Sequence, residues 1–480
     1  MSAATVWASG TAEVAAMPMR PEALVPEMLL VGGAMVILLA GSFLPRRRLW
    51  LTRAVAAAAL VASAATAVAG LAAGPAMAFA GTFAVDPMTG AARLVVTASA
   101  GLLLLLARDE LAGSPREGEM YALMLLASAG AQVMAGGRDL QVLVAGFLLT
   151  SIPLYALIGL ARTGGAAEAA MKTYLLGALA GIGLLLGVAL LYGVGGETSY
   201  DVLAPALRTA PAGAVAAGAV LVLAGVMFKV GAVPAHFWVP DAAQASGVTV
   251  AAFVTTVPKV GGVLAVYRFV DLLPDGIPGS ALVAVLAVLT MTMGNLAAYW
   301  QDDPRRLLGW STVSQAGYLL VPVAVVGRSD LASPSLLYYL AGYAVTNIAA
   351  FAVAAALPRC RDLAAFTGLG RAEPALGGAL LVVLLGLVGT PPTAVFVGKL
   401  TTASAAWDGG AGWLAAAVLV NSVVSLFYYL RWIIPVFRAK ERPVRGAFSP
   451  LPTARWAALV GAAISVALGI AAGPVWALLS

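Results

Sequence analysis

The feature that most constrains this chain is a long series of apolar segments. A membrane-spanning helix needs about 20 predominantly apolar residues, and on that rule the sequence predicts fourteen spanning segments. They lie approximately at residues 22–45, 51–73, 86–107, 118–136, 139–161, 171–193, 214–238, 249–270, 278–300, 305–326, 334–357, 376–402, 411–436 and 454–479. The polar stretches between them are mostly about 5–20 residues long, too short for a separate soluble core. The predicted fold class is an all-α polytopic membrane protein.

Composition agrees with this interpretation and excludes several functions. Charged residues make up only 10% of the chain, whereas globular domains have about 25%. The net charge of +6 does not indicate nucleic-acid binding, because most of the arginines lie in short loops on one predicted side of the bilayer. Iron–sulfur clusters need several thiolates, and a membrane haem normally needs two axial ligands. With one cysteine, Cys360, and one histidine, His236, the chain is expected to hold no redox centre and no metal.

The loops also predict an orientation. Loops after odd-numbered segments contain most of the basic residues, namely Arg46–Arg48, Arg53, Arg108, Arg116, Arg162, Arg305, Arg306, Arg359, Arg361, Arg371, Arg438, Lys440, Arg442, Arg445 and Arg455. Loops after even-numbered segments contain little beyond Arg138, Arg208 and Arg328. Because cytoplasmic loops carry the excess of Lys and Arg, the odd-numbered loops are predicted to face the cytoplasm and both termini the outside.

Two of the segments contain helix breakers. The seventh has Gly231 and Pro234, and the twelfth has Gly389, Pro391 and Pro392. Paired interrupted helices at corresponding places are typical of inverted-repeat transporters, in which broken backbone lines a cavity. Glycine and proline are also common in membrane helices, so simple kinks are the alternative.

The two breaks lie five segments apart, which predicts two inverted five-helix repeats. The predicted division is an N-terminal tail with helices 1–3 at residues 1–117, a first repeat at 118–270, and a second repeat at 271–436. A cytoplasmic loop and helix 14 follow at residues 437–480.

The lysines are the strongest candidates for chemistry. All except Lys440 lie inside apolar segments, at Lys172, Lys229, Lys259 and Lys399. A lysine at the centre of a spanning helix costs roughly 2.5–3.5 kcal/mol on insertion scales. A buried lysine can release its proton, whereas arginine cannot, so this usage favours proton transfer. For Lys172 the alternative is an interfacial side chain that reaches outward at the start of its segment.

Other polar residues extend this hypothesis. His236, a few residues past the seventh segment's break, suits a proton shuttle, although a structural role is also open. A hydrated path is possible through the mid-membrane residues Thr150, Ser151, Thr255, Thr256, Ser311, Ser314, Gln315, Tyr318, Tyr343, Thr346, Asn347 and Asn421. The carboxylates Glu27, Asp86, Glu119, Asp139 and Asp241 all fall near segment ends, where helix termini and solvated rims explain them.

Several of these stretches together carry a family resemblance. They are Phe228–Asp241, Thr256–Val260, Arg306–Tyr318, Tyr343–Phe351 and Gly386–Lys399, joined by Glu168–Gly177 and Asn421–Arg431. They resemble the antiporter-like membrane subunits of respiratory complex I, and their form is most similar to subunit N of bacterial NADH-quinone oxidoreductases. The resemblance extends from about residue 22 to residue 440.

The resemblance implies a fourteen-helix subunit in the membrane arm, with helices 7 and 12 discontinuous, in the bacterial inner (cell) membrane. It implies proton translocation coupled to quinone reduction elsewhere in the enzyme, with NADH, flavin, iron–sulfur clusters and quinone on partner subunits. Its implied partners are other membrane-arm subunits and the lipid bilayer. By the same resemblance, Lys172, Lys229, Lys259 and Lys399 match the family's lysine axis, and His236 matches its histidine after the helix break.

One departure from the family pattern concerns helix 5. The family usually has a glutamate there that pairs with the lysine of helix 7, and this chain has Leu148 at that position. Without it, Lys229 lacks the partner that favours its charged form. One hypothesis is a divergent paralogue with an altered or absent proton step. The other is that a carboxylate from another subunit takes the role.

Three functions therefore compete. The leading prediction is a translocase subunit that pumps protons in an NADH-quinone oxidoreductase. A subunit of a cation/proton antiporter or of a membrane-bound hydrogenase shares the lysine-bearing repeats. A structural subunit that bridges its neighbours without pumping is favoured by Leu148. A solute transporter is less favoured, because no further mid-membrane group would select a solute.

Overall fold

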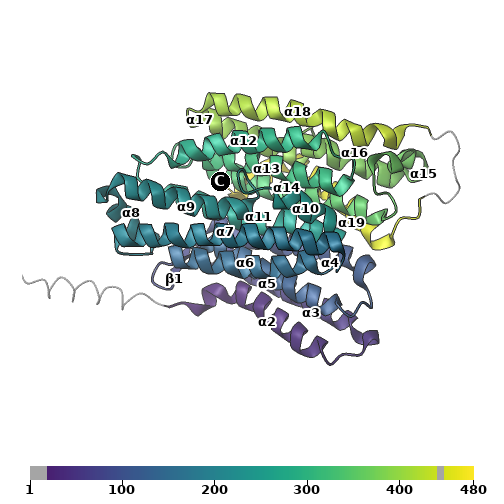
Figure 1. Cartoon of the computed structure of the whole chain (residues 1–480), viewed down its shortest axis with the longest axis horizontal. Helices are drawn as coiled ribbons and strands as arrows, with labels where there is room; N and C mark the ends of the chain where they lie inside the picture. Colours follow the sequence, from purple (N-terminus) through teal and green to yellow (C-terminus); the bar gives the residue numbers. More distant parts are fainter. Residues whose placement is uncertain (1–18, 440–447, 480) are drawn as a thin grey trace, which may run out of the picture.

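The computed structural model describes residues 19–439 and 448–479. The predicted N-terminal tail at residues 1–18 and the basic residues Lys440, Arg442 and Arg445 lie outside the described residues. Within the described part the chain is almost entirely helical, as the apolar segments predict (Figure 1).

The first half of the chain contains a short hairpin among its helices. Its elements are η1 Pro21–Leu24, α2 Val25–Gly41, η2 Arg46–Arg48, α3 Trp50–Ala72, β1 Ala76–Ala78, β2 Phe83–Val85, α4 Pro87–Leu111, α5 Glu117–Gly136, α6 Leu140–Gly159, α7 Gly164–Gly195, α8 Tyr200–Thr209, α9 Ala212–Val230 and α10 Trp238–Ala245. Strands β1 and β2 pair antiparallel, with Met77 opposite Ala84.

The second half is helical throughout its described elements. They are α11 Val248–Leu272, α12 Gly279–Ala298, α13 Pro304–Val323, α14 Ala332–Ala356, η3 Leu363–Phe366, α15 Leu369–Ala372, α16 Pro374–Val388, α17 Ala394–Asp408, α18 Gly412–Phe437, α19 Pro452–Ile470 and α20 Ala472–Leu479. In a bilayer the backbone must satisfy its own hydrogen bonds, and helices do so within one segment.

Short polar residues start several of these helices. The Asp86 carboxylate accepts a hydrogen bond from the backbone N–H of Thr89 at the start of α4. Asp139 and Asp303 cap α6 and α13 in the same way. Because such caps satisfy N–H groups that the helix leaves unpaired, these carboxylates have a structural function. For Asp86 and Asp139 this agrees with their predicted place at segment ends.

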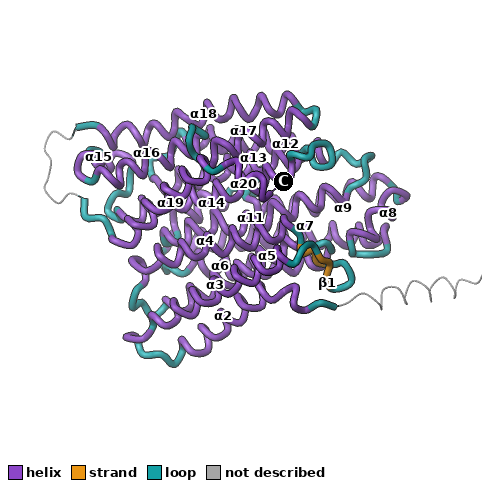
Figure 2. The backbone as a smooth tube through the Cα atoms, turned by 180° about the vertical axis from the view of Figure 1, so that it is seen from behind, coloured by secondary structure: helices purple, strands orange, loops and turns teal. Residues whose placement is uncertain are grey.

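The long helices run side by side, with α2 and α3 along one edge and α17 and α18 along the opposite edge (Figures 1 and 2). Helices α11 and α14 are buried along nearly their whole length, whereas α7 exposes most of its apolar surface. A helix that is apolar on all faces lies inside a bundle or faces lipid. Helices α11 and α14 are therefore the centre of the fold, and α7 lies at its rim.

A buried ion pair joins α2, at the edge of the bundle, to α4. Arg93 of α4 donates two hydrogen bonds to the Glu27 carboxylate of α2, at 2.7 and 2.8 Å. The side chains of both residues are at most 5% exposed. Since a buried charge is tolerated only when it is paired and hydrogen-bonded, this contact fixes how α2 sits against α4.

Each predicted segment overlaps one helix or a pair of helices separated by a break. Among the described residues, eleven helices are long and apolar enough to cross a membrane. The chain is therefore a multi-pass membrane protein. The count of fourteen spans, the two inverted repeats and the domain boundaries remain predictions.

The helical structure is interrupted at two places along these segments. Helix α9 ends at Val230, and Gly231 takes a left-handed conformation with φ 72° before α10 begins at Trp238. Helix α16 ends at Val388, and Gly389 has φ 96° before α17 begins at Ala394. Glycine tolerates this conformation because it has no Cβ. Both interruptions leave carbonyl groups at a helix C-terminus without partners in the helix.

Candidate functional site

The first buried lysine, Lys229, lies in the last turn of α9 and is 2% exposed. Its Nζ donates a hydrogen bond to Ser151 Oγ of α6 at 2.6 Å, and that hydroxyl donates to the carbonyl of Phe147. The ammonium group also lies over the Phe147 ring, 5.0 Å from its centroid. On α11, a Cβ at Gly262 would come within 3.2 Å of Lys229 Cγ, so the side chain lies tightly between α6 and α11.

The second lysine, Lys259, lies in the buried middle of α11 and is also 2% exposed. Its Nζ donates to the backbone carbonyl of Thr312 on α13 at 2.7 Å. The Tyr343 hydroxyl of α14 contacts the same residue, at 3.1 Å from Thr312 Oγ1, and lies 2.8 Å from the carbonyl of Thr255. Lys259 is therefore surrounded by neutral hydrogen-bonding groups of three central helices.

The third lysine, Lys399, lies on α17 beside the second helix break. Its Nζ donates to the carbonyls of Leu387 and Val388, at 3.1 and 2.9 Å, which are the last carbonyls of α16. It also lies 4.0 Å from the centroid of the Tyr318 ring. The C-terminal end of a helix carries partial negative charge, and an aromatic face attracts a cation. The break thus creates the environment that holds this lysine.

Helix α13 connects the second and third lysines. Thr312 accepts from Lys259, and Gln315, one turn further along α13, donates from Nε2 to the Leu387 carbonyl at 2.9 Å. Lys399 donates to that same carbonyl. Hydrogen bonds to neighbouring turns of α13 therefore hold Lys259 of α11 on one side and the α16 carbonyl shared with Lys399 of α17 on the other.

His236 lies in the first break, between α9 and α10, and is 1% exposed. Its ring lies against Phe237 and Trp310, with centroids 4.2 and 5.6 Å apart. Neither imidazole nitrogen makes a well-formed hydrogen bond to the described part of the chain. Buried polar groups are almost always hydrogen-bonded, so this imidazole retains the capacity to donate and accept further hydrogen bonds.

Lys172 does not join the buried lysines. Its side chain is 49% exposed, and it forms ion pairs with Glu168 at 2.7 Å and Asp241 at 3.1 Å. Asp241 in turn pairs with Arg306 at 2.6 Å. Helix α7 begins at Gly164, seven residues before the predicted segment. Lys172 consequently lies in a charged cluster at the rim.

The structure places Leu148 away from the buried lysines as well. Its side chain is 44% exposed on α6, whereas Ser151 on the same helix contacts Lys229. Among residues 19–439 and 448–479, no carboxylate lies within 4.0 Å of Lys229, Lys259 or Lys399. Neutral oxygens and aromatic rings therefore surround all three ammonium groups.

Two members of the site were missing from the sequence interpretation. Tyr339 donates from its hydroxyl to Gln315 Oε1 at 2.5 Å, and Thr312 supplies the acceptor for Lys259. Tyr339 lies one turn before Tyr343 on α14 and could have been found by that spacing. The described residues contain no group of three or more His, Cys, Asp or Glu side chains arranged to hold a metal ion.

Residues 137–425 match the family described as NADH:quinone oxidoreductase/Mrp antiporter, TM. Over 465 residues the chain is 57% identical to NADH-quinone oxidoreductase subunit N of Mycobacterium sp. (strain JLS), covering 96% of this chain and 99% of that relative. A chain of respiratory complex I from Thermus thermophilus is 32% identical, with a TM-score of 0.80 and coverage of 94% and 98%.

A chain of the Mrp complex from Dietzia sp. DQ12-45-1b has the same fold, with a TM-score of 0.82, 23% identity and 95% coverage of both chains. The fold is thus common to subunits of both complexes. Sequence identity, which is higher to the oxidoreductase subunits, distinguishes between the two families. This chain belongs to the family of antiporter-like membrane subunits, and within that family to subunit N of the NADH-quinone oxidoreductases.

Proposed function

We propose that this chain is a proton-translocating subunit in the membrane arm of an NADH-quinone oxidoreductase, with Lys229, Lys259 and Lys399 as its proton relay. The observation that carries the proposal is the position of α13 between two buried lysines: Thr312 accepts from Lys259, and Gln315, one turn further, donates to the carbonyl that also holds Lys399. Ammonium groups held by neutral acceptors can lose and regain a proton without separating from a fixed counter-ion.

The other two candidate residues have different positions in this scheme. Lys172, exposed and paired with Asp241, is the outer member that exchanges protons with the predicted cytoplasmic side. His236 is buried at the first break without a well-formed hydrogen bond to the described residues, and in this proposal it passes protons between water and the buried lysines. An imidazole suits that task because its unperturbed pKa lies near neutral pH.

In this proposal the chain carries no redox centre and takes part in the enzyme as a translocase subunit. NADH, flavin, iron–sulfur clusters and quinone belong to partner subunits, and quinone reduction there drives the protonation changes here. The chain would lie in the bacterial inner membrane with both termini outside. Two inverted repeats, at residues 118–270 and 271–436, would each contain one interrupted helix.

A second candidate function is a bridging subunit that does not pump. Leu148 favours it, because the helix position where the family usually has a carboxylate is apolar and partly exposed. A cation/proton antiporter or membrane hydrogenase subunit would also use this fold. The 57% identity to a subunit N favours the oxidoreductase.

The experiment is quinone-linked proton pumping in vesicles that contain the whole complex. Lys259→Ala removes the ammonium group, and Lys259→Arg keeps a positive charge that cannot be released. A relay requires both variants to move fewer protons per NADH oxidised, at matched assembly and quinone reduction. If Lys259→Arg pumps like the parent complex, the lysine is a fixed charge and the bridging function is favoured.

A further inference from the structure

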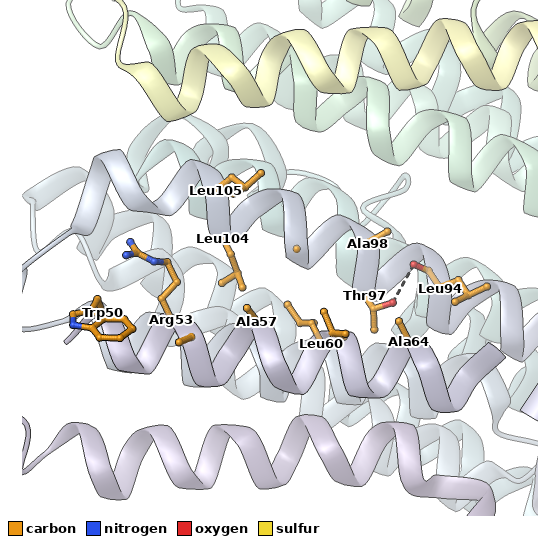
Figure 3. Close-up of a pocket in the computed structure, with 13 residues that line it drawn as sticks. Trp50, Arg53, Ala57, Leu60, Ala64, Leu94, Thr97, Ala98, Leu104 and Leu105 are labelled. Carbon is orange, nitrogen blue, oxygen red and sulfur yellow. Dashed lines mark hydrogen bonds between the residues drawn. The ribbon is translucent and has the colours of Figure 1, made fainter. Parts of the chain in front are cut away.

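Two parts of the bundle lie outside the contacts that hold the buried lysines, and they differ in chemistry. The groove between α3 and α4 has an almost wholly apolar lining (Figure 3). Its charged lining residue, Arg53, is paired with Glu117 at 3.6 Å. The contact of α12, α13 and α18 instead contains hydroxyl and amide groups that the proposed relay does not use. One residue beside those groups, Tyr318 of α13, also contacts Lys399.

The polar region between α12, α13 and α18 consists of Asn295, Ser314, Asn421 and Ser422, with Asn295 at its centre. The Asn295 carbonyl accepts from Ser314 Oγ at 2.8 Å, and its amide donates to the Asn421 side chain at 3.1 Å. A Cβ on Gly294 of α12 would overlap the backbone of Ser314, so α12 and α13 lie in direct backbone contact there. Because α13 is fixed in this way, residues next to Ser314 can move only by rotation of their side chains.

Tyr318 reaches both the third lysine and the polar region. It lies one turn after Ser314 on α13 and is 0% exposed. Lys399 Nζ lies 4.0 Å from the centroid of its ring, a position in which the ring face attracts a cation. The hydroxyl group at the end of the ring lies close to Ser314, Asn295 and Ser422. It makes no well-formed hydrogen bond within the described part of the chain.

Acceptors for this hydroxyl group are present in the polar region. Ser314 Oγ donates its own proton to Asn295, and Ser422 Oγ donates to the Val418 carbonyl, so both oxygens keep lone pairs that can accept. An unpaired buried hydroxyl group destabilises the folded state. The attraction between an ammonium group and an aromatic face is of similar size. Lys399 can therefore hold the ring where its hydroxyl group stays unpaired.

The tyrosine beside the second lysine differs in this respect. The centroid of the Tyr343 ring lies 5.6 Å from Lys259 Nζ. Its hydroxyl group donates to the Thr255 carbonyl at 2.8 Å and contacts Thr312 Oγ1 at 3.1 Å. Tyr343 is thus anchored through its hydroxyl group, whereas Tyr318 is not.

We propose that Tyr318 is a positioning residue that couples the charge of Lys399 to the polar region between α12, α13 and α18. While Lys399 is charged, its ammonium group attracts the ring face and the hydroxyl group stays unpaired. When Lys399 gives up its proton, this attraction is lost, and the ring turns until the hydroxyl group donates to Ser314 or Ser422. The phenol keeps its own proton in both positions. The inference rests on the proposed function, because only a lysine that changes charge would release the ring.

The test is a double-mutant cycle on the whole complex, read as the temperature at which this subunit dissociates. Tyr318→Phe removes the hydroxyl group and keeps the ring, and Lys399→Met keeps the bulk of the lysine stem without its charge. Lys399→Gln, which retains a neutral donor for the Leu387 and Val388 carbonyls, replaces Lys399→Met if that variant does not assemble.

The expected effect of Tyr318→Phe has opposite signs in the two backgrounds. With Lys399 present, at a mildly acidic pH that keeps it charged, the variant loses an unpaired group, and the dissociation temperature should rise by about 1–2 °C. With Lys399→Met the hydroxyl group is hydrogen-bonded, so its removal should lower that temperature by about 1–2 °C.

Tyr338→Phe is the matched control, because the buried Tyr338 hydroxyl group donates to the Leu468 carbonyl of α19 at 2.7 Å. That bond does not depend on the charge at position 399. The control variant should therefore lower the dissociation temperature equally in both backgrounds.

Equal shifts for Tyr318→Phe in both backgrounds would overturn the inference, since the tyrosine would then only fill space beside Lys399. Failure of the proposed function gives a different result. In that case Lys399→Met would pump protons like the parent complex, a measurement that the temperature cycle does not use.

Discussion

Gln315 and Lys399 share one acceptor, because Gln315 Nε2 and Lys399 Nζ both donate hydrogen bonds to the Leu387 carbonyl, at 2.9 and 3.1 Å. That carbonyl belongs to the end of α16 and is free because the helix stops at Val388. A polar side chain and a titratable one are therefore coupled through a single backbone oxygen, so a change in the protonation of Lys399 alters the hydrogen bond of Gln315.

The first prediction tests this coupling. Gln315→Leu has a similar volume but cannot donate to Leu387 or accept from Tyr339. A buried donor or acceptor that is left without its hydrogen-bond partner lowers the free energy of unfolding by about 1–3 kcal/mol. We expect fewer protons pumped per NADH oxidised, with quinone reduction retained. Tyr339→Phe, which keeps the bond to Leu387, should have a smaller effect, and the opposite order of effects would argue against the coupling.

A second prediction concerns Gly389. At φ 96° a side chain is strained, and a Cβ there would lie 2.9 Å from Lys399 Cδ. Gly389→Ala should destabilise the subunit by about 1–3 kcal/mol and displace the lysine, which lowers pumping. Gly378→Ala on α16 is the control, since its Cβ meets nothing within 4 Å. The melting temperature of the purified complex is measured for both variants. Equal melting temperatures for Gly389→Ala and Gly378→Ala would contradict the prediction.

Ser151 provides the third prediction. Ser151→Ala removes the hydroxyl that accepts from Lys229 at 2.6 Å and leaves the Phe147 ring in place. A hydrogen bond to a charged group contributes about 1.5–3 kcal/mol, so we expect the Lys229 ammonium group to be held less firmly and the pumping rate to fall. Ser404→Ala is the control, because that exposed hydroxyl donates to the Leu400 carbonyl of its own helix. Unchanged pumping in Ser151→Ala would show that the hydroxyl has no part in the relay.

The fourth prediction compares two ion pairs. Arg93→Met leaves the Glu27 carboxylate buried without its partner, which typically costs about 3–5 kcal/mol. Arg138→Met breaks the pair with Asp201, whose side chain is 54% exposed, and should cost at most about 1 kcal/mol. Retention of the subunit in the complex during heating or urea treatment should fall for the first variant only. If both variants are lost from the complex to the same extent, burial does not determine how much an ion pair contributes to stability.

Much of the fold could be predicted, because apolar segments of about 20 residues have few alternatives in a membrane. The buried lysines at positions 229, 259 and 399 were also predictable, since each is costly in an apolar segment. Their burial in the structure agrees with that argument.

Other features could not be read from residue types. Hydropathy placed Lys172 in an apolar segment, but α7 is 32 residues long, and its first turns extend beyond the roughly 20 residues that cross a bilayer. The side chain therefore joins Glu168 and Asp241 at the rim. The partners of Lys259 and Lys399 are backbone carbonyls, and every residue type has one.

The Thr312 carbonyl also bears on how this site tolerates mutation. The group that accepts from Lys259 belongs to the main chain, so every substitution at position 312 that preserves α13 leaves the acceptor in place. Thr312→Ala would remove the side-chain contact with Tyr343 while the acceptor of Lys259 persisted. An alanine scan at this position therefore tests the hydroxyl and not the main-chain contact with the lysine. Sequence variability at position 312 would therefore be no measure of its importance to proton transfer.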